Sequence, residues 1–298
     1  MALAASGALA LGSASCEPVI RRRLLQIDQR RDPRHAAWIW QFSYDGSPHA
    51  IAETLAAHRM AAIVKTHDGI DWMATFDHAE GAIAGPAEVA AAARTFEAAG
   101  VPFHAWAVVR GVDPLREAEM AAQVLDAGAR SLTLDLEEGD GFWEGTRDGA
   151  RAFGEALRGR HELARIDVSI DPRPWKWFGI PLREFIDFSD GIRPQLYWDL
   201  FDDVHHMNAF GLFGLEAPGM SPEFLVEASQ RLLSPFDRWI VPIGHGHPPA
   251  TVQEWLRFVR AAQQHQMPEV GVWRLGVTQP EVLRVLAAYP PGAELPAA

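Results

Sequence analysis

The sequence predicts a single-domain α/β protein, a (β/α)8 TIM barrel, and three observations carry that prediction. Eight short segments with strand character recur along the chain, and a helix or a short helical stretch follows each of them. Together they span residues 38–289, close to the roughly 250 residues that are typical of such a barrel. No glycine-rich phosphate loop follows the first strand, which disfavours the rival fold, an open doubly wound sheet.

The expected strands are short runs rich in β-branched, aromatic and small apolar side chains, with polar or glycine-containing stretches between them. They lie at residues 38–43, 61–67, 103–109, 131–137, 166–171, 192–198, 239–243 and 270–275.

Helical spacing and capping residues mark the segments between the strands. One helix is expected over residues 89–99, where Gly100 stops it. A second begins after Asp113-Pro114, because an aspartate cap followed by proline is typical of a first turn. Further helices are expected after Ser221-Pro222, over residues 252–259 and after Gln279-Pro280.

The composition restricts the class of partner. The chain has 298 residues and a formal net charge of −12, so it has no basic surplus that would favour nucleic acid. Its single cysteine excludes an internal disulfide framework and a cysteine-rich metal site. No cofactor motif is present, and no segment is long and apolar enough to span a membrane.

The two ends of the chain differ from the barrel segment. Residues 1–16 are small and apolar, like an export signal that lacks its basic leader, and Cys16 stands where a bacterial lipoprotein would be lipidated. We therefore expect an exported protein whose membrane contact is a lipid anchor at Cys16; a cytoplasmic protein with a frayed N-terminus is the alternative. Residues 17–37 are arginine-rich and are expected to form a linker or arm, and residues 290–298 a disordered tail.

The strand at residues 131–137 is the most informative segment. Leu132, Leu134 and Leu136 alternate with polar residues, so a period of two places the leucines on one face and Asp135 and Glu137 on the other. In a parallel barrel the leucines would meet the outer helices. The two carboxyls would then point into the mouth at the C-terminal ends of the strands, where such barrels keep their chemistry.

The same period predicts a polar, aromatic-flanked mouth. Two carboxyls on one face discourage each other's ionisation, so one of them holds its proton longer, as a general acid for glycoside cleavage requires. The alternative is a structural ion pair of Asp135 or Glu137 with Lys65 or Arg110. The side chains expected at the mouth are Lys65, His67, His104, Trp106, Asp135, Glu137, Ser169, Asp171, Gln195, Tyr197 and Trp273.

Three of these strands resemble the active-site strands of family-18 chitinases. Asp135-Leu136-Glu137 is similar to the Asp-x-Glu strand shared by those chitinases and the family-25 lysozymes, Tyr197 to a chitinase active-site tyrosine, and Trp273 to the tryptophan floor beside the cleaved bond. The resemblance implies that Glu137 is the acid, and that Asp135 orients a substrate N-acetyl group that serves as the nucleophile.

The chain also departs from both families. Thr133 and Arg130 stand where the chitinase motif has further acidic residues. The lysozymes carry aspartates on the first and last strands, where this chain has Gln41 and Arg274, with Asp45 slightly beyond. These departures suggest a distant relative whose activity is altered or lost.

Tryptophan-containing loops after several strands suit a sugar ligand, because indole faces match the C–H faces of pyranose rings; the alternative is that these rings cover the barrel ends. The connection from Asp199 to Met220 is long enough to be a lid or a binding wall. The residues expected to bind substrate are Trp273, Gln195, Asp171, Trp106, His104, Lys65, His67, Trp143, Trp175 and His245.

Three functions remain open at this point. The first is a glycoside hydrolase that cleaves an N-acetylated or cell-wall glycan with Glu137, Asp135 and Tyr197 as its catalytic residues. The second is a catalytically silent barrel that binds glycans. The third is a metal-dependent hydrolase, since His245-Gly246-His247 could join His67, His104 and Asp135 in a metal site, although such barrels usually carry a His-x-His motif on the first strand.

Overall fold

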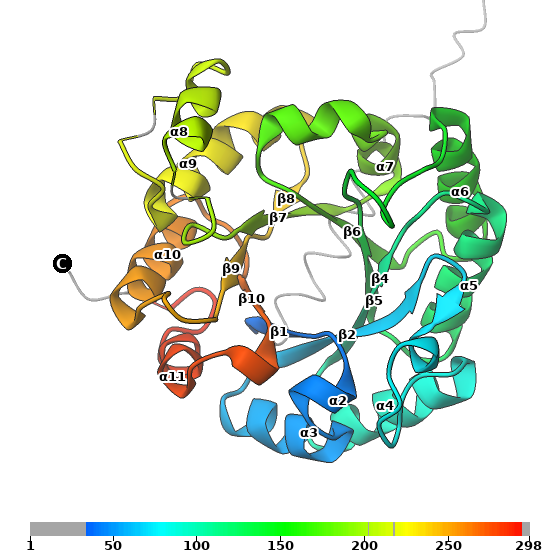
Figure 1. The fold of residues 1–298 in the computed structure, drawn as a ribbon. Helices are drawn as coiled ribbons and strands as arrows, with labels where there is room; N and C mark the ends of the chain where they lie inside the picture. Colours follow the sequence, from blue (N-terminus) through cyan, green and yellow to red (C-terminus); the bar gives the residue numbers. More distant parts are fainter. Residues whose placement is uncertain (1–33, 202, 217, 294–298) are drawn as a thin grey trace, which may run out of the picture. The chain divides into compact units, whose positions relative to one another are not determined.

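Eight strand positions close into a parallel barrel, as the sequence predicts (Figure 1). The computed structural model describes residues 34–201, 203–216 and 218–293. The strands are β1 (Ala36–Ile39), β2 (Ala61–Asp68), β4 (Phe103–Val108), β5 (Ser131–Asp135), β6 (Arg165–Ile170), β7 (Gly191–Leu196), β8 (Trp239–Ile240) with β9 (Ile243–His245), and β10 (Gly271–Trp273). Pairing of β10 with β1 closes the ring, and β3 (Asp71–Trp72) is an antiparallel addition to β2.

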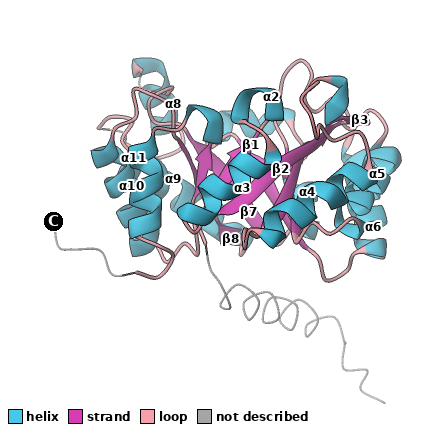
Figure 2. Cartoon of the chain, turned by 90° about the horizontal axis from the view of Figure 1, so that it is seen from below, coloured by secondary structure: helices cyan, strands magenta, loops and turns pink. Residues whose placement is uncertain are grey.

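Helices surround the barrel on its outside (Figures 1 and 2). They are α2 (Phe42–Asp45), α3 (Pro48–Ala57), α4 (Pro86–Ala98), α5 (Pro114–Asp126), α6 (Arg147–Arg160), α7 (Leu182–Phe188), α8 (Val204–Gly211), α9 (Pro222–Leu233), α10 (Val252–Gln264) and α11 (Pro280–Ala288). Short 3-10 turns lie at η2 (Met73–Thr75), η3 (Pro174–Gly179), η4 (Ser234–Phe236) and η5 (Leu275–Val277).

The predicted caps are confirmed. The side chain of Asp113 accepts a hydrogen bond from the backbone N–H of Arg116, and Ser221 accepts one from Phe224. Each cap satisfies a donor that the first turn of its helix leaves free, and the proline that follows is already set to a helical φ.

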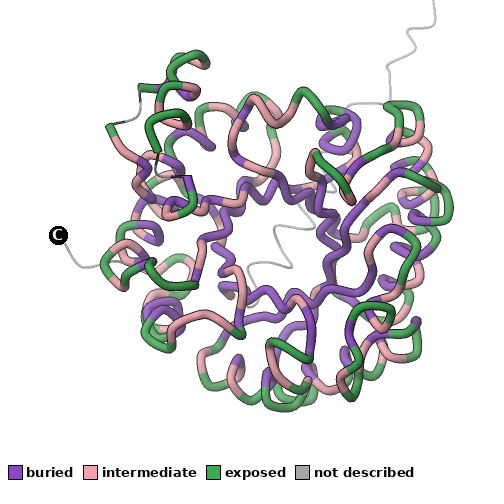
Figure 3. Tube along the Cα trace, in the orientation of Figure 1, coloured by how far each residue is buried: buried purple, intermediate pink, exposed green. Residues whose placement is uncertain are grey.

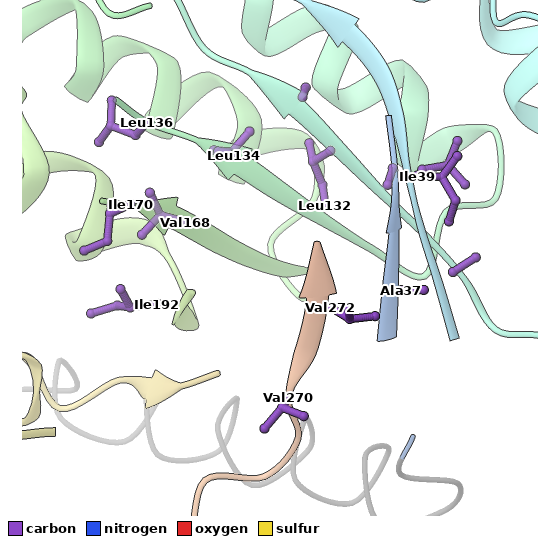
Figure 4. Packing of buried hydrophobic residues seen from close by; sticks show 14 of the residues in the cluster. Ala37, Ile39, Leu132, Leu134, Leu136, Val168, Ile170, Ile192, Val270 and Val272 are labelled. Atoms are coloured by element: carbon purple, nitrogen blue, oxygen red, sulfur yellow. The ribbon is translucent and has the colours of Figure 1, made fainter. Parts of the chain in front are cut away.

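Two apolar cores lie on the two faces of the barrel strands, which are buried along their length (Figure 3). Leu132, Leu134 and Leu136 belong to the outer core between strands and helices, in line along β5 (Figure 4). Thr133 and Asp135 pair in register with Trp106 and Val108, which belong to the inner core. The predicted orientation of this strand is therefore confirmed, and a slip of one residue is excluded.

Most strand boundaries differ from the prediction by one or two residues, and two strands differ for reasons that their surroundings explain. The first strand begins at Ala36 and ends at Ile39, so the predicted arm of residues 17–37 overlaps it; Asp77 then accepts hydrogen bonds from the N–H groups of Phe42 and Ser43 and starts α2 early. The seventh strand is split between β8 and β9, because Pro242 has no N–H to give to the ladder.

The expectations for residues 1–16, including an anchor at Cys16, and for the arm up to residue 33 lie outside the described residues, as does the tail from residue 294 onward. No helix in the described ranges has both the length and the apolar character needed to cross a bilayer.

Candidate active site

Three tryptophans fill the barrel axis beneath its mouth. Trp38 of β1, Trp106 of β4 and Trp273 of β10 lie with ring centroids 5.3, 5.5 and 6.1 Å apart, in tilted or edge-to-face contacts. The indole N–H of Trp106 donates to the carbonyl oxygen of Ile39, which fixes that ring. The floor of the mouth is therefore rigid and aromatic.

Asp135 and Glu137 meet above this floor through Gln195 of β7. The amide nitrogen Nε2 of Gln195 lies 3.0 Å from Oδ1 of Asp135 and 2.7 Å from Oε1 of Glu137. It also lies 3.2 Å from the hydroxyl of Ser169 on β6. Three neighbouring strands thus bring two carboxyls, an amide and a hydroxyl to one point, as the period-two reading of each strand predicts.

Both carboxyls have raised pKa values. Burial raises the pKa of Asp135 well above its usual value, and the charge of Glu137 raises it further. Burial also raises the pKa of Glu137, where the hydrogen bond from Gln195 opposes the shift and the charge of Asp171 adds to it. Because ionising both of two close carboxyls is unfavourable, one of them keeps its proton to higher pH, and an acid catalyst needs such a proton.

Tyr197 and His245 form the wall next to these carboxyls. Their ring centroids lie 5.3 Å apart, and burial with the charges of Asp135 and Glu137 raises the pKa of Tyr197 well above its usual value. Nδ1 of His245 lies 2.7 Å from Oδ2 of Asp199, so the imidazole is oriented by a carboxylate. Because its pKa is raised, Tyr197 stays a neutral hydroxyl at any ordinary pH.

The alternative ion pair of Asp135 or Glu137 with Lys65 or Arg110 does not form. Both cations bind Asp68 instead, Lys65 at 2.9 Å and Arg110 at 2.6 Å. Lys65 also lies 5.0 Å from the ring centroid of Trp106, and its charge opposes the rise in the pKa of Asp135. Lys65 is thus a mouth residue, as expected, but Asp68 neutralises it.

Aromatic side chains ring the mouth, and the sequence predicted only some of them. Trp40, Phe142, Tyr197 and Trp273 are half-buried and pack on the inner core. Trp143 does not join them, because it is buried in the outer core against Phe185. In the run Gly141-Phe142-Trp143 no periodicity tells which ring turns inward.

Trp175 is only partly available to a ligand. Its ring stacks on His206 with an interplanar angle of 16° and contacts Phe210 of α8 edge-on. The long connection after β7 therefore packs on the loop after β6. Asp171 is also engaged, in a double contact with Arg173 that includes a bond of 2.5 Å.

Two histidines expected at the mouth lie elsewhere. A β-bulge between Lys65 and His67 shifts the register, so that His67 pairs with Ala107 of the outer core and contacts Trp72, and burial lowers its pKa to about 3. His104 faces the interior but binds Ser131, the first residue of β5, at the opposite end of the barrel.

The candidate ligands of the metal-site alternative are therefore not brought together, because His67 and His104 lie away from His245 and Asp135. Among the residues that the structure describes, no group of three or more histidine, cysteine, aspartate or glutamate side chains is arranged to hold a metal ion.

Comparison with solved structures shows which proteins have a similar fold. The chain superposes on a glycoside hydrolase family 18 N-acetylglucosaminidase from Paenibacillus barengoltzii with a TM-score of 0.57 at 10% identity, covering 86% of this chain and 99% of that one. The likeness is one of fold, a (β/α)8 barrel. Active domain 2 of a chitinase from Pyrococcus furiosus gives a TM-score of 0.56 at 11% identity, over 86% of this chain and 94% of that one.

A class V chitinase from Nicotiana tobaccum is similar to the same degree, with a TM-score of 0.56 at 9% identity over 85% of this chain and 97% of that one. No family model and no curated protein matches the sequence. The resemblance to family-18 chitinases that three strands predict is thus confirmed as a likeness of fold.

Asp45 is not free to act as a lysozyme-like carboxylate. It binds Arg274 and accepts hydrogen bonds from the backbone N–H groups of Trp40 and Gly276.

Asp199 and Phe142 are site residues that the prediction missed. Asp199 continues the inward period of Gln195 and Tyr197, so that signal was present in the sequence.

Proposed function

We propose that this protein is a glycoside hydrolase that cleaves an N-acetylated or cell-wall glycan with Glu137 as the general acid. The observation that carries the proposal is the bridge from Gln195 to Asp135 and Glu137, which holds two carboxyls with raised pKa values over a tryptophan floor. A chitinase domain and a family 18 N-acetylglucosaminidase that share the fold over 86% of this chain support it.

In this proposal Glu137 gives its proton to the glycosidic oxygen as the bond to the anomeric carbon breaks. The carbonyl oxygen of the substrate's own N-acetyl group forms the new bond to that carbon, held by Asp135 and the hydroxyl of Tyr197. Water then opens the cyclic intermediate and returns a proton to Glu137. Trp273 and His245, which are partly exposed, would contact the sugar, and the buried ring of Trp106 would support Trp273.

The arrangement of Asp171 favours this substrate-assisted route over a two-carboxylate one. A second enzyme nucleophile or base would need a carboxylate opposite Glu137. Asp171 is the nearest candidate by strand position, and its carboxylate is already bound by Arg173. The N-acetyl group of the substrate supplies the missing nucleophile.

Substitution of the acid tests the proposal. Glu137→Gln keeps the shape but removes the transferable proton, so turnover should fall about 10²–10⁴-fold with binding nearly intact. Glu138→Gln is the matched control, because Glu138 is the adjacent carboxylate and pairs with Lys176 at 2.6 Å. Turnover would be measured on a panel of glycans with and without N-acetyl groups. Normal turnover by Glu137→Gln, or rapid cleavage of glycans that lack N-acetyl groups, would contradict the acid or the substrate-assisted route respectively.

A silent glycan-binding barrel is the second candidate, and one residue favours it. Thr133 faces the barrel interior where the chitinase motif has an acidic residue. Calorimetric binding of a glycan that the protein never cleaves, over the whole panel, would establish this function and exclude the first.

We also propose that the protein acts outside the cytoplasm, as the composition of residues 1–16 suggests. Expression behind a basic leader followed by cell fractionation tests this. Recovery in the cell envelope with a lipid on Cys16 is expected, and recovery in the cytoplasm alone would contradict it.

A further inference from the structure

The sequence predicts that Gln195 binds substrate, but in the structure its amide nitrogen is engaged by the protein itself. It lies on β7 in register with Ile243 of the inner core, so its side chain projects across the barrel interior toward β5. Its amide nitrogen faces Asp135, Glu137 and Ser169 within 3.2 Å. That nitrogen is already satisfied by the protein, and only the amide oxygen is left for a ligand.

The orientation of the amide follows from its neighbours. The reverse orientation would bring the amide oxygen against an oxygen of each carboxyl, which is repulsive unless both carboxyls are protonated at those atoms. With Nε2 facing them, the two amide hydrogens meet two carboxyl oxygens. The hydroxyl of Ser169 is at the longest of the three distances, 3.2 Å, and can itself donate to Asp135.

This contact distinguishes the two oxygens of each carboxyl. An oxygen that accepts an N–H keeps that hydrogen bond only while it carries no proton, because the hydroxyl oxygen of a carboxylic acid is a poor acceptor. In Glu137 the accepting atom is Oε1, at 2.7 Å from the amide nitrogen. In Asp135 it is Oδ1, at 3.0 Å. The proton of either group is therefore more stable on the other oxygen.

We propose that Gln195 is a positioning residue that directs the acid proton of Glu137 to Oε2 and that of Asp135 to Oδ2, by hydrogen bonding to Oε1 and Oδ1. The catalytic consequence of this positioning rests on the proposed function, in which Glu137 protonates the substrate. A proton on Oε2 points away from the bridge that Gln195 forms. Its direct consequence, the bias in carboxyl titration, does not depend on any activity.

The test replaces Gln195 with methionine, which has a similar length and no donor. The amide N–H groups stabilise the ionised carboxylates, so their loss should raise the pKa of both Asp135 and Glu137. Carbon-13 NMR of the side-chain carboxyls across pH reports those values directly. If the native protein is active, the alkaline limb of the pH–activity profile should lie at higher pH in the Gln195→Met variant, because activity is lost as Glu137 ionises. We expect kcat to fall about 10- to 100-fold, the effect of losing a hydrogen bond to a charged group, with KM nearly unchanged.

Gln195→Glu is the second variant, and it keeps the fold testable if methionine does not. The protonated carboxyl that this substitution introduces can donate to one of the two native carboxyls, so at low pH it should recover part of the kcat that methionine loses. Gln123→Met is the matched control, because Gln123 binds Glu119 on the exposed face of α5. It should leave both carboxyl titrations and the pH profile as in the native protein.

Two results would overturn the inference. One is a Gln195→Met protein that is folded by circular dichroism and has native carboxyl titrations. The other is a loss confined to KM, which would make Gln195 a substrate contact instead. Absence of turnover in the native protein on every glycan would remove the proposed function, while the carboxyl titrations would still decide the role of Gln195.

Discussion

At the residue scale, the raised pKa values of the two mouth carboxyls lower the stability of the folded protein. Asp135 and Glu137 have raised pKa values in the folded protein, first of all because of burial. A carboxyl with a raised pKa contributes most below its unfolded value, and that contribution is lost as pH rises through the folded value. At neutral pH the pair therefore destabilises the fold, which is common where a site is built for chemistry and not for stability.

This gives a prediction that needs no substrate. Glu137→Gln and Asp135→Asn each remove one ionisable group, so each should raise the melting temperature at pH 7 by about 2–4 °C, the shift that ~1 kcal/mol produces in a domain of this size. At pH 4, where the native groups hold their protons, the gain should largely disappear. Thermal melts at both pH values measure it, with Glu138→Gln as control. An equal gain at both pH values would show that the burial of charge is not its cause.

At the element scale, close approach of helices limits side-chain size. Gly154 of α6 lies where a Cβ atom would come within 2.3 Å of the ring of Phe188. That ring cannot easily move, because it packs on Phe153 and Phe185 at 6.0 and 5.4 Å between centroids. The glycine lets α6 and α7 approach each other over the outer core.

Two alanine variants on α6 separate this effect from helix propensity. Gly154→Ala should destabilise the protein by about 1–3 kcal/mol through overpacking. Gly159→Ala on the same helix meets nothing within 4 Å and should instead stabilise it by up to about 1 kcal/mol. Urea unfolding of both variants measures the difference. Equal effects of the two substitutions would contradict the role assigned to Phe188.

At the scale of the whole molecule, a buried ion network ties the barrel together at the end opposite the mouth. Arg165 and Asp167 of β6, Arg193 of β7 and Glu269 before β10 form contacts of 2.8–3.1 Å across the interior. Asp167 is fully buried and Arg193 is 2% exposed. A charged layer here takes the place of the Val, Ile and Leu that usually fill such barrels.

Removal of one cation should destabilise the whole domain. Arg193→Met leaves Asp167 and Glu269 with one partner between them, so the free energy of unfolding should fall by about 3–5 kcal/mol, the usual cost of breaking a buried pair. Arg284→Met is the control, because Arg284 pairs with Glu281 on the surface and its loss should cost under ~1 kcal/mol. Chemical denaturation measures both. A cost for Arg193→Met no larger than that of the control would show that the network adds nothing net.

Much of this architecture was determined by the sequence alone. The alternation in residues 131–137 places three leucines outward and two carboxyls inward, since a strand has a period of two whatever surrounds it. Asp113 and Ser221 likewise set the starts of two helices, because a cap acts within the first turn of its own helix.

Only the tertiary structure decided which of these side chains meet. The bulge before His67 reverses its face, Arg173 occupies Asp171, and Trp143 turns to the outer core while Phe142 turns in. The outcomes at His67 and Trp143 depend on the register of a neighbouring strand and on a partner distant in the chain. Arg173 lies only two residues from Asp171, but strand periodicity does not predict their contact. Gln195 bridges Glu137 and Asp135, which precede it by 58 and 60 positions in the chain. The bridge exists because closure of the barrel brings β5 and β7 to either side of β6.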